Sequence, residues 1–151
     1  LYGWLGVDLK WVIKKELRKV PVIGFAADKG GNIFIDRSDP KAAYESLRQA
    51  RKKVVNGTSI IILPEGTRSR NGEVGEFKKG AFWLARELKL PILPVTIMNT
   101  GKILPTGTFD LFPGRAVMKV HQPIDTAACD DASFDDLIDK VRDIIRAGLD
   151  N

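Results

Sequence analysis

Short apolar runs typical of β-strands alternate with helical patterns along this chain, and this alternation limits the folds open to it. Strand patterns cover residues 8–13, 33–35, 59–63, 92–98 and 115–121. Helical patterns cover residues 39–56, 81–88 and 133–145, with a short helical turn at 14–17. The run at 59–63 is almost entirely apolar and suits the middle of a covered sheet. We therefore expect an α/β fold with a central, mostly parallel and possibly mixed sheet flanked by helices.

Two of the helices begin at recognisable capping residues. Asp39 precedes Pro40, which is a favourable pair for an N-cap and the first helical position. Ser133 is followed three residues later by Asp136, a capping-box arrangement. The Gly/Pro-rich connection at residues 100–114 is expected to be irregular.

The chain is long enough for one domain. Its 151 residues, 44% of them hydrophobic, can bury a real core but are too few to expect two domains, so we predict a single domain over residues 1–151. No run approaches the eighteen or so apolar residues of a membrane-spanning helix. The start, Leu1–Leu5, is typical of the end of an element that began upstream, and we expect an N-terminally truncated fragment.

The net charge of +5 is unevenly distributed. Residues 115–151 hold five Lys/Arg and eight Asp/Glu, whereas residues 1–114 hold nineteen and eleven. The N-terminal three quarters should attract anions such as nucleic acid, anionic lipid head groups or phosphorylated metabolites. One His and one Cys are too few ligands for a zinc site, and Cys129 has no partner for an internal disulfide, which favours a reducing compartment.

Polar clusters follow two of the predicted strands. They are Phe34-Ile35-Asp36-Arg37 and Pro64-Glu65-Gly66-Thr67-Arg68. In α/β sheets, ligands bind beyond the carboxyl ends of the strands. An arginine offers paired donors that match phosphate oxygens, a glycine lets the backbone approach a ligand, and a threonine adds a hydroxyl, so a phosphomonoester fits. The alternative is that Arg37 and Arg68 form ordinary loop salt bridges with Asp36 and Glu65.

The order of several motifs resembles that of a known family. They are KKEL at 14–17, FIDR at 34–37, PEGTRS at 64–69, FKKGAFWLA at 77–85 and LPVTI at 93–97. This order is similar to that in the lysophosphatidic acid acyltransferases, part of the glycerolipid acyltransferase superfamily, and the resemblance covers about residues 1–125. PEGTRS downstream of FIDR is the most specific part of it.

The resemblance implies transfer of a fatty acyl group from acyl-CoA or acyl carrier protein to the sn-2 hydroxyl of lysophosphatidic acid, giving phosphatidic acid without a bound cofactor. It also implies which residues bind the glycerol phosphate: Arg37, Glu65, Gly66, Thr67 and Arg68, with Lys14 as a further contact. Alternatives are an acyltransferase for glycerol 3-phosphate or another lysophospholipid, or a non-catalytic module that binds anionic lipid or nucleic acid. Stacking aromatics interleaved with basic residues are not evident, so nucleic acid is not the expected partner.

One sequence motif that the family resemblance implies is missing from these 151 residues. The resemblance implies a His and an Asp separated by four residues ahead of FIDR, in which the His is the general base for direct attack on the thioester. No histidine precedes His121, so we expect the block upstream of Leu1 and a chain that is nearly inactive alone. His121 and Asp125 have the wrong spacing and position, which favours a strand-end histidine. Cys129 has no basic neighbour to activate it as a nucleophile.

Aromatic and cationic residues are mixed near the N-terminus, as in interfacial segments. They are Trp4, Lys10, Trp11, Lys14, Lys15, Arg18 and Lys19. Core packing of Trp11 and solvated lysines are the alternative. Since the acceptor carries a long acyl chain, we expect the whole enzyme to be membrane-associated at the cytoplasmic face. Phe25, Phe77, Phe82 and Trp83 could line an acyl groove, but core packing is the simpler role.

Overall fold

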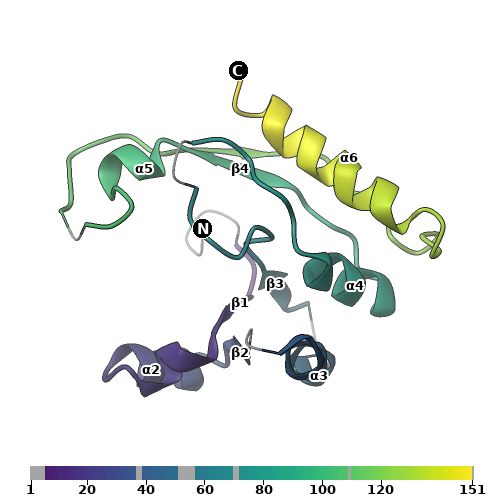
Figure 1. Ribbon diagram of the computed structural model, residues 1–151, viewed down its shortest axis with the longest axis horizontal. Helices are drawn as coiled ribbons and strands as arrows, with labels where there is room; N and C mark the ends of the chain where they lie inside the picture. The colour runs from purple at the N-terminus through teal and green to yellow at the C-terminus, as the bar shows by residue number, and fades with distance from the viewer. Residues whose placement is uncertain (1–5, 37–38, 51–56, 70–71, 109, 151) are drawn as a thin grey trace. The chain divides into compact units, whose positions relative to one another are not determined.

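The computed structural model describes residues 6–36, 39–50, 57–69, 72–108 and 110–150 (Figure 1). The chain divides into two units, Leu1–Leu63 and Pro64–Asn151. The first unit carries a three-stranded sheet and the second a two-stranded sheet.

The first unit is built on parallel strands in the order β2-β1-β3. They are β1 (Leu9–Lys14), β2 (Ile33–Ile35) and β3 (Ser59–Ile61). In β1, Val12 lies opposite Ile33 of β2, and Lys10 lies opposite Ile60 of β3. The carboxyl ends of all three strands therefore point the same way, and the predicted parallel sheet is confirmed.

The apolar run at residues 59–63 does not form the middle of this sheet. β3 ends at Ile61, and among the described residues it pairs with β1 alone. Its residues are half-buried, and Leu63 is exposed. The prediction of a central strand was wrong, because an apolar run indicates packing on the faces of a strand but not how many strands bond to its edges.

Helical segments connect the strands of the first unit. They are the 3₁₀ segment η1 (Lys15–Lys19), α2 (Ile23–Lys29) and α3 (Pro40–Ala50). Asp39 caps α3 as predicted, since its carboxylate accepts the N–H groups of Lys41 and Ala42 at 3.2 and 3.1 Å. The α2 helix was not predicted, because its seven residues are fewer than the window in which a helical period can be recognised.

The second unit combines an antiparallel strand pair with three helices. Its elements are α4 (Lys79–Glu87), β4 (Val95–Met98), α5 (Thr100–Ile103), β5 (Val117–Val120) and α6 (Phe134–Ala147). β4 and β5 pair antiparallel, and a bridge between Ile92 and Ile124 extends the pairing. The sheet of the first unit is therefore parallel throughout, and that of the second unit is antiparallel. The segment expected to be irregular, residues 100–114, begins with the single turn α5.

The core of the second unit lies between α4 and α6 (Figure 1). Phe82 of α4 is buried against Leu137, Ile138 and Val141 of α6. The three α6 residues recur at a helical spacing, so they form one stripe that faces α4 and β4. This is the apolar face that the sequence predicted.

The four aromatic side chains considered for an acyl groove have different surroundings. The rings of Phe77 and Phe82 stack with their centroids 6.0 Å apart, and both belong to the core. Trp83 is half-buried. Phe25, in contrast, is 69% exposed. Core packing is thus confirmed for Phe77 and Phe82 and was wrong for Phe25.

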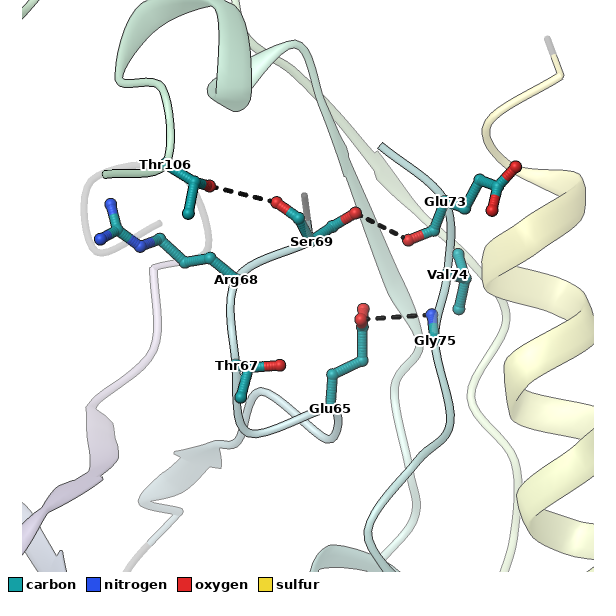
Figure 2. A pocket seen from close by; sticks show the side chains of 8 residues that line it. All are labelled: Glu65, Thr67, Arg68, Ser69, Glu73, Val74, Gly75 and Thr106. Carbon is teal, nitrogen blue, oxygen red and sulfur yellow. Dashed lines mark hydrogen bonds between the residues drawn. The ribbon is translucent and has the colours of Figure 1, made fainter. Parts of the chain in front are cut away.

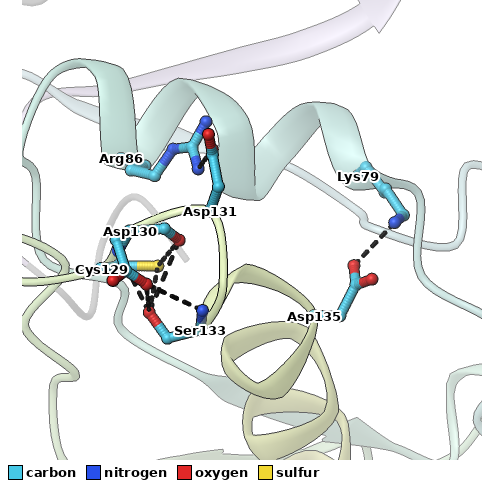
Figure 3. A network of polar contacts seen from close by, with 7 residues as sticks. All are labelled: Lys79, Arg86, Cys129, Asp130, Asp131, Ser133 and Asp135. Carbon is cyan, nitrogen blue, oxygen red and sulfur yellow. Dashed lines mark hydrogen bonds and ion pairs between the residues drawn. The ribbon is translucent and has the colours of Figure 1, made fainter.

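The capping box predicted at the start of α6 does not form. The Ser133 side chain makes no cap hydrogen bond to the first turn. Instead, its hydroxyl donates to the Asp130 carboxylate at 2.7 Å, and the same carboxylate accepts the Ser133 N–H at 2.9 Å (Figure 3). These two hydrogen bonds favour the ionised form and hold the pKa of Asp130 below its usual value. Asp130 therefore closes the turn that leads into α6.

Acid is expected to loosen this turn. Because the pKa of Asp130 is lower in the folded protein than in the unfolded chain, its stabilising contribution is present above the unfolded pKa, about 4, and is lost as the pH falls through the folded pKa. An NMR titration of the Asp130 carboxyl group should give a midpoint below that of an unstructured aspartate. Asp130→Asn should remove this acid-dependent step, whereas Asp136→Asn in the first turn of α6 should not. A midpoint at or above the unstructured value would contradict the assignment.

The longest described helix, α6, has fourteen residues. A membrane-spanning helix needs about 20 predominantly apolar residues. Within the described ranges, no helix is both long enough and apolar enough to cross a bilayer.

Candidate functional site

A closed loop carries the EGTR residues. It follows β3 and ends at Lys78, whose N–H donates to the carbonyl oxygen of Pro64 at 2.8 Å. The two ends of the loop are thereby held together just before α4. Gly66 has φ +72°, a left-handed conformation that a residue with a Cβ adopts at a cost of about 1–2 kcal/mol. A glycine is therefore needed where the loop turns after Glu65.

The loop surrounds an open hollow of about 500 Å³ (Figure 2). Its lining consists of Glu65, Thr67, Arg68, Ser69, Glu73, Val74, Gly75 and Thr106. This volume is within the range of small-molecule sites, about 300–1,000 Å³. Three of the predicted site residues line the hollow, and Gly66 lies between them in the chain.

The Glu65 carboxylate tethers the two sides of the loop. Its Oε2 atom accepts the N–H of Gly75 at 3.2 Å. A Cβ added at Gly75 would lie 3.0 Å from the same oxygen, so this close approach requires a glycine unless the carboxylate moves. Sequence reasoning missed Gly75, which is ten positions from Glu65 and lies outside the motif.

The Arg68 guanidinium is exposed and lies on the other side of the loop from the Glu65 carboxylate (Figure 2). Among the described residues, no carboxylate is within ion-pair distance of it, and it makes no hydrogen bond to them. The alternative that Arg68 pairs with Glu65 is therefore wrong for this structure. The five N–H donors of the guanidinium remain directed to solvent.

Two hydroxyls stabilise the far side of the hollow. The Ser69 hydroxyl donates to the Glu73 carbonyl oxygen and accepts the Gly72 N–H, each at 2.9 Å. The Thr106 hydroxyl donates to the Ser69 carbonyl oxygen at 3.2 Å (Figure 2). Ser69 stands inside the PEGTRS motif and could have been singled out. Thr106 is 37 positions away along the chain, and no local pattern indicates it.

The remaining predicted residues belong to the first unit. Lys14 ends β1 opposite Ile35 of β2, and its Nζ atom lies 3.4 Å from a carboxylate oxygen of Glu16. Asp36, which follows β2, accepts a hydrogen bond from Lys15 Nζ at 3.2 Å. Arg37 lies outside the described residues. Lys14 is thus at the carboxyl edge of the sheet, as the last residue of β1 rather than in the predicted helical turn. A common phosphate contact for Lys14, Arg37 and the EGTR loop stays a prediction.

His121 has a structural contact that accounts for it. Its Nε2 atom lies 2.8 Å from the hydroxyl oxygen of Thr96, which is 1% exposed. The Thr96 hydroxyl donates its one hydrogen to the Ile145 carbonyl oxygen, at an O–O distance of 3.0 Å. His121 must therefore donate from Nε2 to the Thr96 oxygen, since a hydroxyl has one hydrogen. The expected strand-end histidine is confirmed, just beyond β5.

Cys129 and its surroundings show no catalytic features. Its sulfur lies 3.8 Å from the Ser133 hydroxyl oxygen and 3.6 Å from the Asp130 carbonyl oxygen (Figure 3). The nearby ion pairs, Arg86–Asp131 and Lys79–Asp135, hold α4 to the segment around the start of α6 (Figure 3). In the part of the chain that the structure describes, no group of three or more His, Cys, Asp or Glu could hold a metal ion.

Comparisons with known proteins identify the family. Residues 2–98 match the family model described as Acyltransferase. The chain is 39% identical over 121 residues to the chloroplastic 1-acyl-sn-glycerol-3-phosphate acyltransferase of Brassica napus, and 35% identical over 127 residues to that of Arabidopsis thaliana. These matches cover 80% and 83% of this chain but only 35% and 36% of the two relatives. The chain therefore spans about a third of their length.

A solved structure has the same fold. The crystal structure of the 1-acyl-sn-glycerophosphate acyltransferase PlsC of Thermotoga maritima matches with a TM-score of 0.76 and 31% identity. The match covers 92% of this chain and 54% of that one. It confirms the predicted α/β architecture and the resemblance drawn from the motifs. The chain belongs to the acyltransferase family.

Proposed function

We propose that this chain supplies the acceptor-binding part of an acyltransferase that moves a fatty acyl group from acyl-CoA or acyl carrier protein to the sn-2 hydroxyl of lysophosphatidic acid. The relatives named above are 1-acyl-sn-glycerol-3-phosphate acyltransferases, and about one third of their length aligns with this chain. In this proposal residues 1–151 form one acyltransferase domain, and phosphatidic acid is the product.

The observation that carries the proposal is the exposed guanidinium of Arg68 at a hollow of about 500 Å³. A phosphomonoester needs paired donors and a positive charge, and a guanidinium offers both. Arg68 is not neutralised by any described carboxylate, so its charge is available to a ligand. Thr67, the preceding residue, is also exposed and adds a hydroxyl to the lining of the hollow.

The other predicted residues have supporting roles in this proposal. Lys14, the last residue of β1, and Arg37 of the FIDR motif add positive charge toward the same phosphate. Gly66 provides the turn that presents Thr67 and Arg68. An ionised carboxylate can accept hydrogen bonds but cannot donate them, so we assign Glu65 to holding the loop through Gly75 rather than to direct contact with phosphate oxygens.

The reaction needs a general base that these residues do not provide. The acceptor hydroxyl oxygen attacks the thioester carbonyl carbon and loses its proton to the base, while the C–S bond breaks and the thiol leaves protonated. His121 is engaged with Thr96, and no histidine precedes it in residues 1–120. We propose that the base is the His of a His-Asp block that the family resemblance places before FIDR.

A series of acceptors tests the proposal. Monomeric short-chain lysophosphatidic acid is expected to bind about tenfold or more tightly than the matching monoacylglycerol, because a charge-assisted contact to phosphate contributes roughly 1.5–3 kcal/mol. Isothermal titration calorimetry with the chain measures both. Glycerol 3-phosphate and lysophosphatidylcholine complete the series and separate the alternative acceptors. Equal affinity for the ligand without phosphate would refute the proposal.

Glu65 is expected to act through the loop. Glu65→Ala removes the hydrogen bond to Gly75, so lysophosphatidic acid binding should weaken about threefold to tenfold, the effect of about 1 kcal/mol. Glu65→Gln keeps an acceptor oxygen and should bind nearly as well as the unchanged chain. If both variants lost binding equally, the carboxylate charge rather than the tether would be responsible.

A further inference from the structure

Large apolar side chains are exposed along one short stretch of the first unit. Those of Leu17, Val20, Val22, Ile23 and Phe25 lie within nine positions of the chain. Val22 is 79% exposed, and Phe25 is 69% exposed. We refer to these five side chains as the η1–α2 surface. Isolated exposed apolar residues are ordinary, but a contiguous group of them marks an interaction site.

The local fold directs this surface outward. Gly24 is buried, and a Cβ added there would overlap the carbonyl of Arg18 in η1. The Gly24 side of α2 therefore lies directly against η1. Because successive residues of a helix are about 100° apart, Ile23 and Phe25 project about 100° to either side of Gly24, and both side chains are exposed. Packing of α2 on η1 thus leaves its apolar side exposed.

The backbone at Val22 supports a role beyond packing. Its φ of 65° lies in a region that a β-branched residue rarely adopts. Such conformations persist where the surrounding structure imposes them, and they are more frequent at functional sites. Here the conformation starts α2 and places the Val22 side chain in solvent.

Cations border the apolar side chains. Residues 14–29 contain five Lys/Arg and two Asp/Glu. The Lys29 Nζ atom lies 5.8 Å from the centre of the Phe25 ring, so one cation stands directly at the apolar surface. Lys19 is exposed and makes no hydrogen bond or ion pair to the described residues. Exposed apolar groups with adjacent positive charge match the interface of an anionic bilayer.

We propose that the η1–α2 surface docks on an anionic phospholipid bilayer. Val22, Ile23 and Phe25 enter the boundary between head groups and acyl chains, while Lys19 and Lys29 contact lipid phosphates. The positive charge favours an anionic bilayer over an apolar protein groove, which would have to desolvate the same cations. This surface shares no residue with the EGTR loop, so vesicle binding can be measured independently of the proposed acyl transfer.

Vesicle binding tests the apolar part. The chain should sediment with phosphatidylcholine vesicles that contain phosphatidylglycerol. Phe25→Ser and Val22→Ser should each weaken that binding by about tenfold, the effect of removing one buried apolar side chain. Leu111→Ser is the matched control, because Leu111 is equally exposed but lies in the second unit. Circular dichroism verifies that the variants stay folded. Unchanged binding of Phe25→Ser and Val22→Ser would overturn the proposal.

Two charge-reversal variants and a tryptophan fluorescence reporter complete the test. Lys19→Glu should weaken binding about tenfold at low salt, and Lys89→Glu, an exposed lysine of the second unit, should not. Tryptophan emission of Phe25→Trp should shift to the blue on these vesicles, whereas that of Leu111→Trp should not. Equal binding to vesicles of phosphatidylcholine alone would overturn the role of charge. Lipid-independent self-association that Phe25→Ser abolishes would overturn docking on lipid in favour of a second copy.

Discussion

Arg68→Ala is expected to weaken the binding of short-chain lysophosphatidic acid by about 10- to 100-fold. The substitution removes charge-assisted hydrogen bonds that contribute roughly 1.5–3 kcal/mol, and each 1.4 kcal/mol is a factor of ten in affinity. The fold should not change, because the Arg68 side chain is exposed and has no partner among the described residues. Titration calorimetry with the monomeric ligand gives the affinity, and thermal unfolding verifies the stability.

Two further variants show whether the site or the overall charge is responsible. Arg68→Lys keeps the charge but loses the planar fork, so its affinity should fall between those of the unchanged chain and Arg68→Ala. Arg146→Ala removes the same charge from an exposed residue in the last turn of α6. Arg146→Ala should bind normally. If it weakened binding as much as Arg68→Ala, a non-catalytic module with diffuse anion binding would be the better description.

Joining a general base to this chain is expected to raise acyl transfer by about 10²–10⁴-fold. The 151 residues alone should be nearly inactive, since His121 donates to Thr96 and no other histidine is present. The test uses an acyltransferase segment that carries a His-Asp block with four intervening residues, fused ahead of residue 1. Release of free thiol from acyl-CoA in the presence of lysophosphatidic acid measures the rate.

The control for that experiment is the same fusion with the His of the supplied block replaced by alanine. It should be as slow as the 151 residues alone. Fast transfer by the unfused chain would contradict the assignment and require another base. Equal rates with and without the supplied His would show that the added segment acts through folding.

Local patterns predicted most of the elements. The capping carboxylate of Asp39, the apolar stripe of α6 and the strand pattern of β1 each depend on residues a few positions apart. Two failures also arise from local features. The α2 helix is too short for its period to be visible, and the Ser133 hydroxyl bonds to Asp130 rather than to the helix. In the Ser133 case the outcome depends on competition between nearby contacts.

In the candidate site, too, some features follow from the sequence and others only from the tertiary structure. The sequence by itself determined the chemistry available: a guanidinium at Arg68, a carboxylate at Glu65, a glycine that permits the turn, and no histidine before position 121. Only the tertiary structure decided that Glu65 bonds to Gly75, that Arg68 stays unpaired among the described residues, and that Phe25 is exposed. The reason is physical. Side-chain chemistry and backbone preference are local properties, whereas pairing and burial depend on which distant segments the folded chain brings into contact.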